Sequence, residues 1–316
     1  MIDSQVRLFL QVRDFSRVGV ILGLLLVNEF SHNFINLDLP VQVGIALIAL
    51  IIGIPHGAVD HLLSVPKLLS LKMARFLIGY LLVTGLAIWF MLEVPLLGFQ
   101  IIVLLSAIHF GIGDASFYME IFQRMGIQRF SRLLYALAAG STPVVIPLVS
   151  KQTANTLQTV NPELVGWAGG YSQMILGLCI GANLMVVSFL LIKKFYSPAI
   201  DLLILLVVAY FAPPLVAFAL YFGLWHAMRH TARLTLEYGP AVKKHEEGKS
   251  KASFWIAVRA GLPAVAIVLA FTVVLAVSRV DISGNSLLWY LLVVTWALTV
   301  PHMALTAKSD VRALQI

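Results

Sequence analysis

Charged residues are scarce in this sequence of 316 residues. Asp, Glu, Lys and Arg together make up 12% of it, whereas ordinary soluble proteins contain about 25%. Apolar residues make up 60%. A soluble domain of this length could not bury so much apolar surface, because its outer shell has to face water. The shortage of charge therefore excludes a soluble enzyme and a disordered chain, and it favours a membrane protein.

Cysteine is nearly absent, and so are repeats and linkers. The single cysteine, Cys179, excludes an intrachain disulfide and with it a disulfide-stapled secreted domain. The apolar runs are continuous rather than alternating, which argues against a transmembrane β-barrel. The polar start of the sequence, MIDSQVRLFLQVRDFSR, does not resemble a cleavable signal peptide. We expect residues 1–316 to form one integral-membrane domain.

Long apolar runs are what the sequence has in abundance. A helix that crosses a membrane needs about 20 mostly apolar residues. Candidate spans lie at 18–35, 39–62, 73–93, 95–117, 130–149, 170–192, 198–212, 214–236, 254–277 and 286–307. Pro213-Pro214 divides the longest run, because proline lacks an N–H donor and disfavours helix in the preceding residue. The sequence predicts an all-α, polytopic transmembrane bundle of eight to ten spans without a soluble domain.

The distribution of basic residues favours ten spans. With ten crossings and the N-terminus inside, only Lys151 and Arg279 of the 22 basic residues fall outside. Basic residues collect in cytoplasmic loops, so this rule explains the net charge of +7 without a nucleic-acid partner. We expect a multi-pass protein of the inner (plasma) membrane with both termini in the cytoplasm. The segment 237–253 is then a charged cytoplasmic loop.

Histidines are concentrated in one layer of the predicted membrane region. Five of the eight fall in the inner halves of spans that run in the same direction: His56, His109, His226, His230 and His302. Ionisable residues inside a membrane are costly and usually mark a functional site. His226 and His230 are four residues apart, so they share a helix face and can bind one metal ion. We predict a metal site in the bundle core with His56, His109, His226 and His230 as ligands.

Four polar residues near these histidines have open roles. His302 can be a fifth ligand, a substrate contact or a structural residue, and His61 can be interfacial or lie in an outer shell of the site. Asp60 follows His56 by four residues, and Asp114 follows His109 by five. Either carboxylate can orient a ligating histidine, or it can cap a helix end and meet arginines.

Aromatic residues gather around the same motifs. Four of them are candidates for a substrate pocket: Phe110, Tyr221, Phe222 and Trp225. At helical spacing such residues either pack the core or line an apolar tunnel. The sequence leaves both interpretations open.

Four segments together carry a family resemblance. GIPHGAVDHLL, HFGIGD, WHAMRH and a late PH resemble the Brp/Blh family of membrane carotenoid-cleaving oxygenases, over about residues 18–307. The family's motif histidines match His56, His109, His226 and His230 of this sequence, which are the four residues chosen above by depth.

This resemblance implies a function and a cofactor. The expected activity is that of a β-carotene 15,15′-dioxygenase, in which β-carotene and O2 give two molecules of all-trans-retinal. It also implies a non-haem Fe(II) held by histidines. The substrate would come from the bilayer, and the retinal product would pass to a microbial rhodopsin.

Two other classes of function remain open at this point. Buried histidines can relay protons in an ion or proton transporter, although no repeat typical of transporters is visible. A membrane metal-dependent oxygenase, such as a desaturase or hydroxylase, could act on another lipid, although those enzymes carry more clustered histidine motifs. A retinal-binding opsin is disfavoured, because no lysine lies at the middle of a predicted span.

Overall fold

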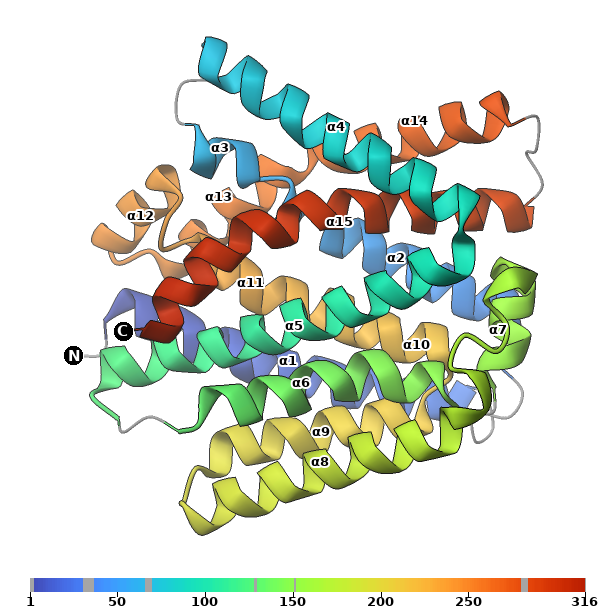
Figure 1. Ribbon diagram of the computed structural model, residues 1–316. Helices are drawn as coiled ribbons and strands as arrows, with labels where there is room; N and C mark the ends of the chain where they lie inside the picture. Colours follow the sequence, from blue (N-terminus) through green and yellow to red (C-terminus); the bar gives the residue numbers. More distant parts are fainter. Residues whose placement is uncertain are drawn as a thin grey trace.

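The computed structural model describes residues 3–30, 37–65, 70–127, 130–150, 152–279 and 284–315. Within these ranges the chain is almost entirely helical and contains no β-strand, which confirms the all-α prediction. Most helices run along one direction and form a bundle (Figure 1). The α-helices are α1 (Ser4–Phe30), α2 (Leu39–Gly57), α3 (Asp60–Ser64), α4 (Leu71–Glu93), α5 (Pro95–Met125), α6 (Arg132–Leu148), α7 (Thr153–Val160), α8 (Ser172–Ile192), α9 (Tyr196–Phe211), α10 (Pro214–Ala219), α11 (Ala227–Leu234), α12 (Gly239–Glu246), α13 (Ser250–Gly261), α14 (Pro263–Ser278) and α15 (Gly284–Gln315).

The helices are those of a multi-pass membrane protein. In the described part of the chain, six are long and apolar enough to cross a membrane: Leu39–Ser64, Leu71–Glu93, Pro95–Met125, Gly169–Ile192, Ser250–Ser278 and Ser286–Ala307. The bent pair formed by α6 and α7 would make a seventh. A helix lies at each of the ten predicted spans, but length and composition alone do not make every one of them a crossing. The count of ten stays a prediction.

The double proline separates two helices, as the sequence predicts. The helix α9 ends at Phe211, and α10 begins at Pro214. Ala212 has an extended backbone with φ −75° and ψ 145°, because a residue before proline avoids the helical region.

The segment 237–253 is not a loop, so this expectation was wrong. It contains α12, a three-residue link and the start of α13. Ala241 is fully buried, and the Ser253 hydroxyl donates a hydrogen bond of 2.8 Å to the Ala241 carbonyl oxygen. The high charge of this stretch belongs to the exposed side of α12, and its few small residues pack inward. The average composition of the segment combines its exposed and its buried side, so it does not reveal that one side is packed.

His245 of α12 is buried against the first helix, and its titration should affect stability. Its ring nitrogens lie 3.1 Å from Ser4 Oγ and 2.9 Å from Thr235 Oγ1. Burial lowers the pKa of His245, while the Asp3 carboxylate opposes this effect and the Arg124 guanidinium adds to it. The folded protein therefore favours the neutral ring. Its stabilisation is complete above the unfolded pKa of about 6.5 and is lost as the pH falls from there toward the lower folded value.

Thermal unfolding of detergent-solubilised protein on both sides of that pH measures the effect. We expect the unfolding temperature to fall on acidification more in the wild type than in His245→Gln, which keeps a hydrogen-bonding side chain but does not titrate. Equal decreases in the two proteins would show that His245 is not responsible.

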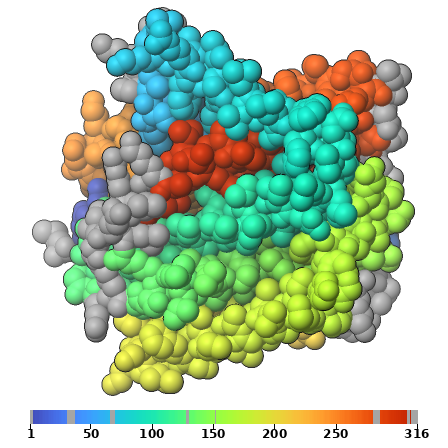
Figure 2. Space-filling view, in the orientation of Figure 1, coloured from blue at the N-terminus to red at the C-terminus, as the bar shows by residue number. Residues whose placement is uncertain are grey.

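Close helix contacts fix the position of α5. A side-chain carbon added to Gly111 would lie 1.9 Å from the Ala136 carbonyl oxygen, and one added to Gly140 would lie 1.8 Å from the Ala107 carbonyl oxygen. Only glycine allows the backbones of α5 and α6 to approach this closely. The helix α15 lies on the other side of α5 and is visible between α4 and α5 in the space-filling view (Figure 2).

The two ends of the chain lie at the same end of the bundle, together with α12, whereas α7 lies at the opposite end (Figure 1). This arrangement is consistent with an even number of crossings.

Candidate functional site

Five histidine rings from different parts of the chain meet inside the bundle. They come from α2 (His56), α5 (His109), α15 (His302) and the continuous helical segment that carries His226 and His230. Each residue is between 2% and 6% exposed. The sequence-based prediction that these five histidines share one layer agrees with this cluster, and His302 belongs to it as fully as the four predicted ligands do.

The rings form a closed circuit with one ring beside it. Centroid distances run 5.2 Å from His56 to His226, 5.2 Å from His226 to His109, 5.4 Å from His109 to His302 and 5.4 Å from His302 to His56. The ring of His230 lies within 6.2 Å of all four.

The helix that carries two of the histidines contains a π-helical segment, Leu220–His226. There the Ala227 N–H donates to the Phe222 carbonyl oxygen, five residues earlier. A π-turn inserts an extra residue into the helical register and occurs often at functional sites. In this segment the rings of Tyr221 and Phe222 lie 6.2 and 6.3 Å from the His226 ring, and sequence periodicity does not reveal the π-turn.

Hydrogen bonds set the orientation of two rings. Nδ1 of His56 donates to the Gly53 carbonyl oxygen, and Nδ1 of His302 donates to Asp60 Oδ2 over 2.8 Å. In both rings this leaves the lone pair on Nε2. A carboxylate or carbonyl bonded to the far nitrogen is the usual support for a metal-binding histidine.

Several ring nitrogens have no partner. In the described residues, Nε2 of His109, His226, His230 and His302 and Nδ1 of His230 are buried without a hydrogen bond. Buried polar atoms are nearly always paired, so this group requires an explanation. An electrophile shared among the rings, such as a metal cation, would satisfy these nitrogens together.

As the side chains stand in the described ranges, no group of three or more His, Cys, Asp or Glu residues meets the requirements for holding a metal ion. Metal–nitrogen bonds measure about 2.0–2.1 Å, so ligand rings have to approach one point closely. The donor types and the unpartnered nitrogens fit a metal, while the ring positions would have to contract around it.

The two acidic candidates have different partners. Asp60 is 6% exposed and supports His302, not the neighbouring His56. Asp114 accepts hydrogen bonds of 3.0 and 3.2 Å from Trp225 Nε1 and pairs with Arg229. His61 lies outside the ring circuit and bonds through Nδ1 to the Ala58 carbonyl oxygen at 2.9 Å.

A buried ion network lies behind the histidine helix. The sequence left open that Asp114 meets arginines, which the structure confirms, but it did not predict the part of Asp201. Arg229, between the two motif histidines, is 2% exposed. Its guanidinium lies 2.7 Å from Asp201 Oδ2 and 3.4 Å from Asp114 Oδ1. It also stacks over the Trp225 ring at 3.7 Å from the centroid, so Trp225 serves this network. The sequence did offer a signal for this network, because Asp201 is an acidic residue early in the apolar run of α9.

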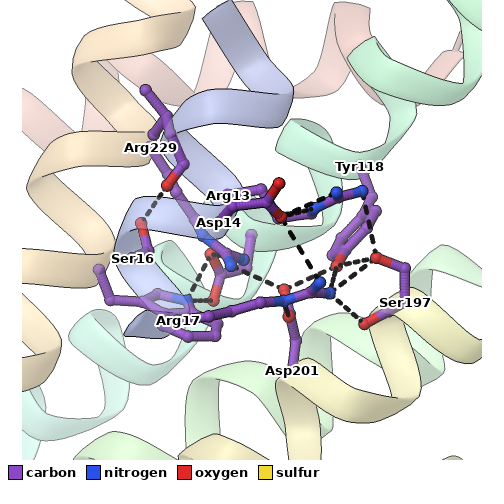
Figure 3. Close-up of polar contacts among 11 residues, drawn as sticks. Arg13, Asp14, Ser16, Arg17, Tyr118, Ser197, Asp201 and Arg229 are labelled. Carbon is purple, nitrogen blue, oxygen red and sulfur yellow. Dashed lines mark hydrogen bonds and ion pairs between the residues drawn. The ribbon is translucent and has the colours of Figure 1, made fainter. Parts of the chain in front are cut away.

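The network continues to the first helix (Figure 3). Arg17 Nε lies 2.6 Å from Asp201 Oδ1. The other carboxylate oxygen of Asp201 accepts from the Tyr118 hydroxyl over 2.7 Å. Two arginines and two aspartates thus balance in charge inside the bundle, and they tie α1, α5, α9 and α11 together.

This network corrects the interpretation of three basic residues. Arg17, Arg229 and Arg233 were counted among the cytoplasmic positive charges, but their side chains are 16%, 2% and 8% exposed. Arg233 pairs with Asp310. These arginines satisfy buried acids, so they do not bear on membrane orientation as free loop charges would.

A lateral pocket of about 500 Å³ opens beside the histidines. His56, His109 and His302 line its inner end. Leu81 of α4 and Ile267 of α14 line its outer part and are 62% and 66% exposed. Phe110 and Phe222 also line it. In a membrane, those exposed side chains of α4 and α14 would face lipid, so this pocket joins the histidines to the lipid-facing surface.

A polar cavity of about 390 Å³ reaches the cluster from another direction. Its walls include Asp60, Glu120, His230 and Arg233. The cluster therefore borders both an apolar pocket and a more polar cavity, and these share the wall residues Asp60 and Phe76.

The fold and the site define a class: a multi-pass helical membrane protein with a buried imidazole cluster at the end of an apolar pocket. The family model described as beta-carotene 15,15′-dioxygenase matches residues 47–310, and the chain belongs to this family. The matched range includes all five clustered histidines. The resemblance inferred from the motifs is thus confirmed.

Two relatives carry corresponding names. The chain is 30% identical over 190 residues to "Beta-carotene 15,15′-dioxygenase" of an uncultured marine bacterium, 66A03, and this match covers 57% of the chain but only 64% of the relative. It is 25% identical over 286 residues to "Probable beta-carotene 15,15′-dioxygenase Blh" of Halobacterium salinarum, covering 83% and 82%. No solved structure matches the chain.

Proposed function

We propose that this protein cleaves β-carotene at its central 15,15′ double bond with O2 and releases two molecules of retinal. The observation that carries the proposal is the cluster of five buried imidazoles, three of which line the inner end of a pocket that also has highly exposed apolar side chains in its wall. Membership of the family and the names of the two relatives support the choice of substrate.

The lateral pocket suits a substrate dissolved in the bilayer. A carotenoid is an apolar polyene, and a membrane enzyme that opens to lipid does not have to extract it into water. The route between α4 and α14 would lead such a chain past Phe110 and Phe222 to the histidines. These aromatic walls exclude water and hold the polyene in place, which is the main contribution that a protein makes when a cofactor performs the chemistry.

His56, His109, His226 and His230 are the proposed ligands of a non-haem Fe(II), with His302 as a fifth. Imidazole is a suitable donor for iron, and bound Fe(II) would supply the activation of O2. Asp60 would hold the ring of His302 with its Nε2 lone pair available. The polar cavity offers a hydrophilic cation a path to His230 that avoids the apolar pocket.

The reaction balances without an acid or base from the protein. The central C=C bond breaks, each of its two carbons receives one oxygen atom of O2, and two aldehyde C=O bonds form. No proton has to be added or removed. The protein's residues then need only to position the polyene and to keep water away from the histidines.

Oxygen-isotope labelling tests the proposal directly. Purified protein in lipid nanodiscs, loaded with Fe(II), is given β-carotene under isotopically labelled O2, and the products are separated by chromatography with mass detection. We expect retinal in a molar ratio of two per β-carotene consumed, with one label in each aldehyde. Unchanged β-carotene in a folded, iron-loaded sample would contradict the proposal.

We also propose that the protein lies in the plasma membrane with both termini cytoplasmic, and that its retinal passes to a rhodopsin-type acceptor. The common position of the two termini at one end of the bundle supports the even number of crossings (Figure 1).

A further inference from the structure

A second apolar pocket lies inside the bundle and shares wall residues with the lateral pocket beside the histidine cluster. This inner pocket, of about 140 Å³, is lined by residues of α5, α6, α7, α10 and α15. It leads away from the chain termini toward α7 at the opposite end of the bundle (Figure 1). Leu157 and Val160 of α7 form its far wall.

The inner and lateral pockets meet at the histidines. Phe110, Phe222, Thr295 and Thr299 line both of them. The Phe110 ring lies 4.3 Å from the His226 ring, and the Phe222 ring lies 5.7 Å from the His56 ring. A chain passing from one pocket to the other therefore has to cross in front of the histidine cluster.

The two pockets differ in their walls. Leu77, Leu81 and Ile267 of the lateral pocket are 42%, 62% and 66% exposed. Every residue that lines the inner pocket is buried or half-buried. The lateral pocket thus reaches the lipid-facing surface, while the walls of the inner one belong to the interior.

The inner pocket has the shape of a narrow slot. On α5 its wall runs along one helix face, through Phe99, Ile102, Val103, Ser106 and Phe110. Phe99 and Phe110 are eleven residues apart, which corresponds to about 16 Å along the helix axis. A long pocket of small volume fits a thin extended chain better than a compact ligand.

We propose that the inner pocket holds one half of the polyene, and that its far wall at Leu157 and Val160 sets which double bond lies beside the histidines. This inference rests on the proposed function and deepens it. The lateral pocket would hold the other half, with the central bond at the junction of the two. Central cleavage then follows from the depth of the inner pocket, and no residue has to recognise the central bond itself.

Leu157→Trp tests the far wall. Leu157 is 6% exposed, so a larger ring there extends into the pocket and keeps the substrate from entering fully. The polyene then lies displaced toward the lateral pocket, and a bond nearer to its inner end reaches the histidines. We expect β-carotene to give pairs of unequal aldehydes, one shorter and one longer than retinal, in equal amounts. Val160→Trp should shift the products in the same way.

Leu178→Trp provides the matched control, because Leu178 is 64% exposed on α8. This variant should give retinal alone, as the wild type does. Iron content and elution volume of each purified variant are compared with those of the wild type, so that a misfolded protein is recognised.

If Leu157→Trp does not cleave β-carotene, a second substrate shows whether the inner pocket has merely become too short. A polyene aldehyde shortened at one end should still be cleaved, because its shorter half fits the reduced pocket. Loss of cleavage of both substrates in a folded, iron-loaded variant would overturn the inference. Central cleavage at the wild-type rate would overturn it as well. A wild-type protein that cleaves no polyene would instead contradict the proposed function.

Discussion

Replacing Arg229 with methionine is expected to lower the free energy of unfolding by about 3–5 kcal/mol, because removing one partner of a buried ion network leaves uncompensated charge. Asp114 and Asp201 are 1% and 0% exposed, and Arg229 contacts both carboxylates. Methionine keeps most of the volume over the Trp225 ring, so the loss reports charge more than packing. Thermal or denaturant unfolding in detergent, followed by tryptophan fluorescence, measures it.

Two further variants give this prediction its control. Arg124→Met breaks a pair with Glu120 on side chains that are 24% and 17% exposed, and it should cost no more than about 1 kcal/mol. The double variant Arg229→Met with Asp114→Asn leaves the remaining pair of Arg17 and Asp201 balanced in charge. It should be less destabilised than the sum of its single variants by roughly 0.5–3 kcal/mol. Strict additivity would show that the two side chains do not interact.

Replacing His230 with alanine is expected to abolish both iron binding and carotenoid cleavage. The His230 ring is the one that has all four other clustered rings within 6.2 Å, and both of its nitrogens are buried without a partner. The measurement is iron per protein by elemental analysis after purification, together with retinal formed from β-carotene.

His61→Ala is the matched control for this prediction. His61 also lines the lateral pocket, but its Nδ1 is bonded to the Ala58 carbonyl oxygen and its ring is not part of the circuit. This variant should retain its iron. An active His230→Ala protein without iron would contradict the assignment of the histidines to a metal.

The architecture could be predicted from the sequence because lipid imposes simple rules. Continuous apolar runs can only be membrane helices when every backbone polar group has to be paired within its own segment. The break at Pro213-Pro214 follows from the missing donor of proline. Segment 237–253 could not be predicted in the same way, since the eight residues of α12 pack through Ala241 and His245 only, and the high average charge of the segment conceals these two.

The histidines could be placed together because an imidazole in a span is conspicuous and its depth can be counted. The partners of the acids could not be predicted. Asp60 and Asp114 each follow a histidine closely, yet one supports His302 and the other binds Arg229. Those pairings depend on how α11 and α15 are rotated against α5 and α3. The π-turn before Ala227 shifts the helical register by one residue, and this shift cannot be predicted from composition or periodicity.

In the proposed reaction, the contrast between the lateral pocket and the inner pocket would also impose an order in which the two products leave. Once the polyene is cut, the fragment beside the exposed side chains of α4 and α14 can diffuse directly into lipid. The fragment against α7 has to travel back past the histidines first. The two products would then leave one after the other, and the fragment in the inner pocket would block the binding of the next polyene until it has left. Release of the fragment from the inner pocket would accordingly limit the turnover rate, and added retinal would inhibit the reaction by binding in the inner pocket.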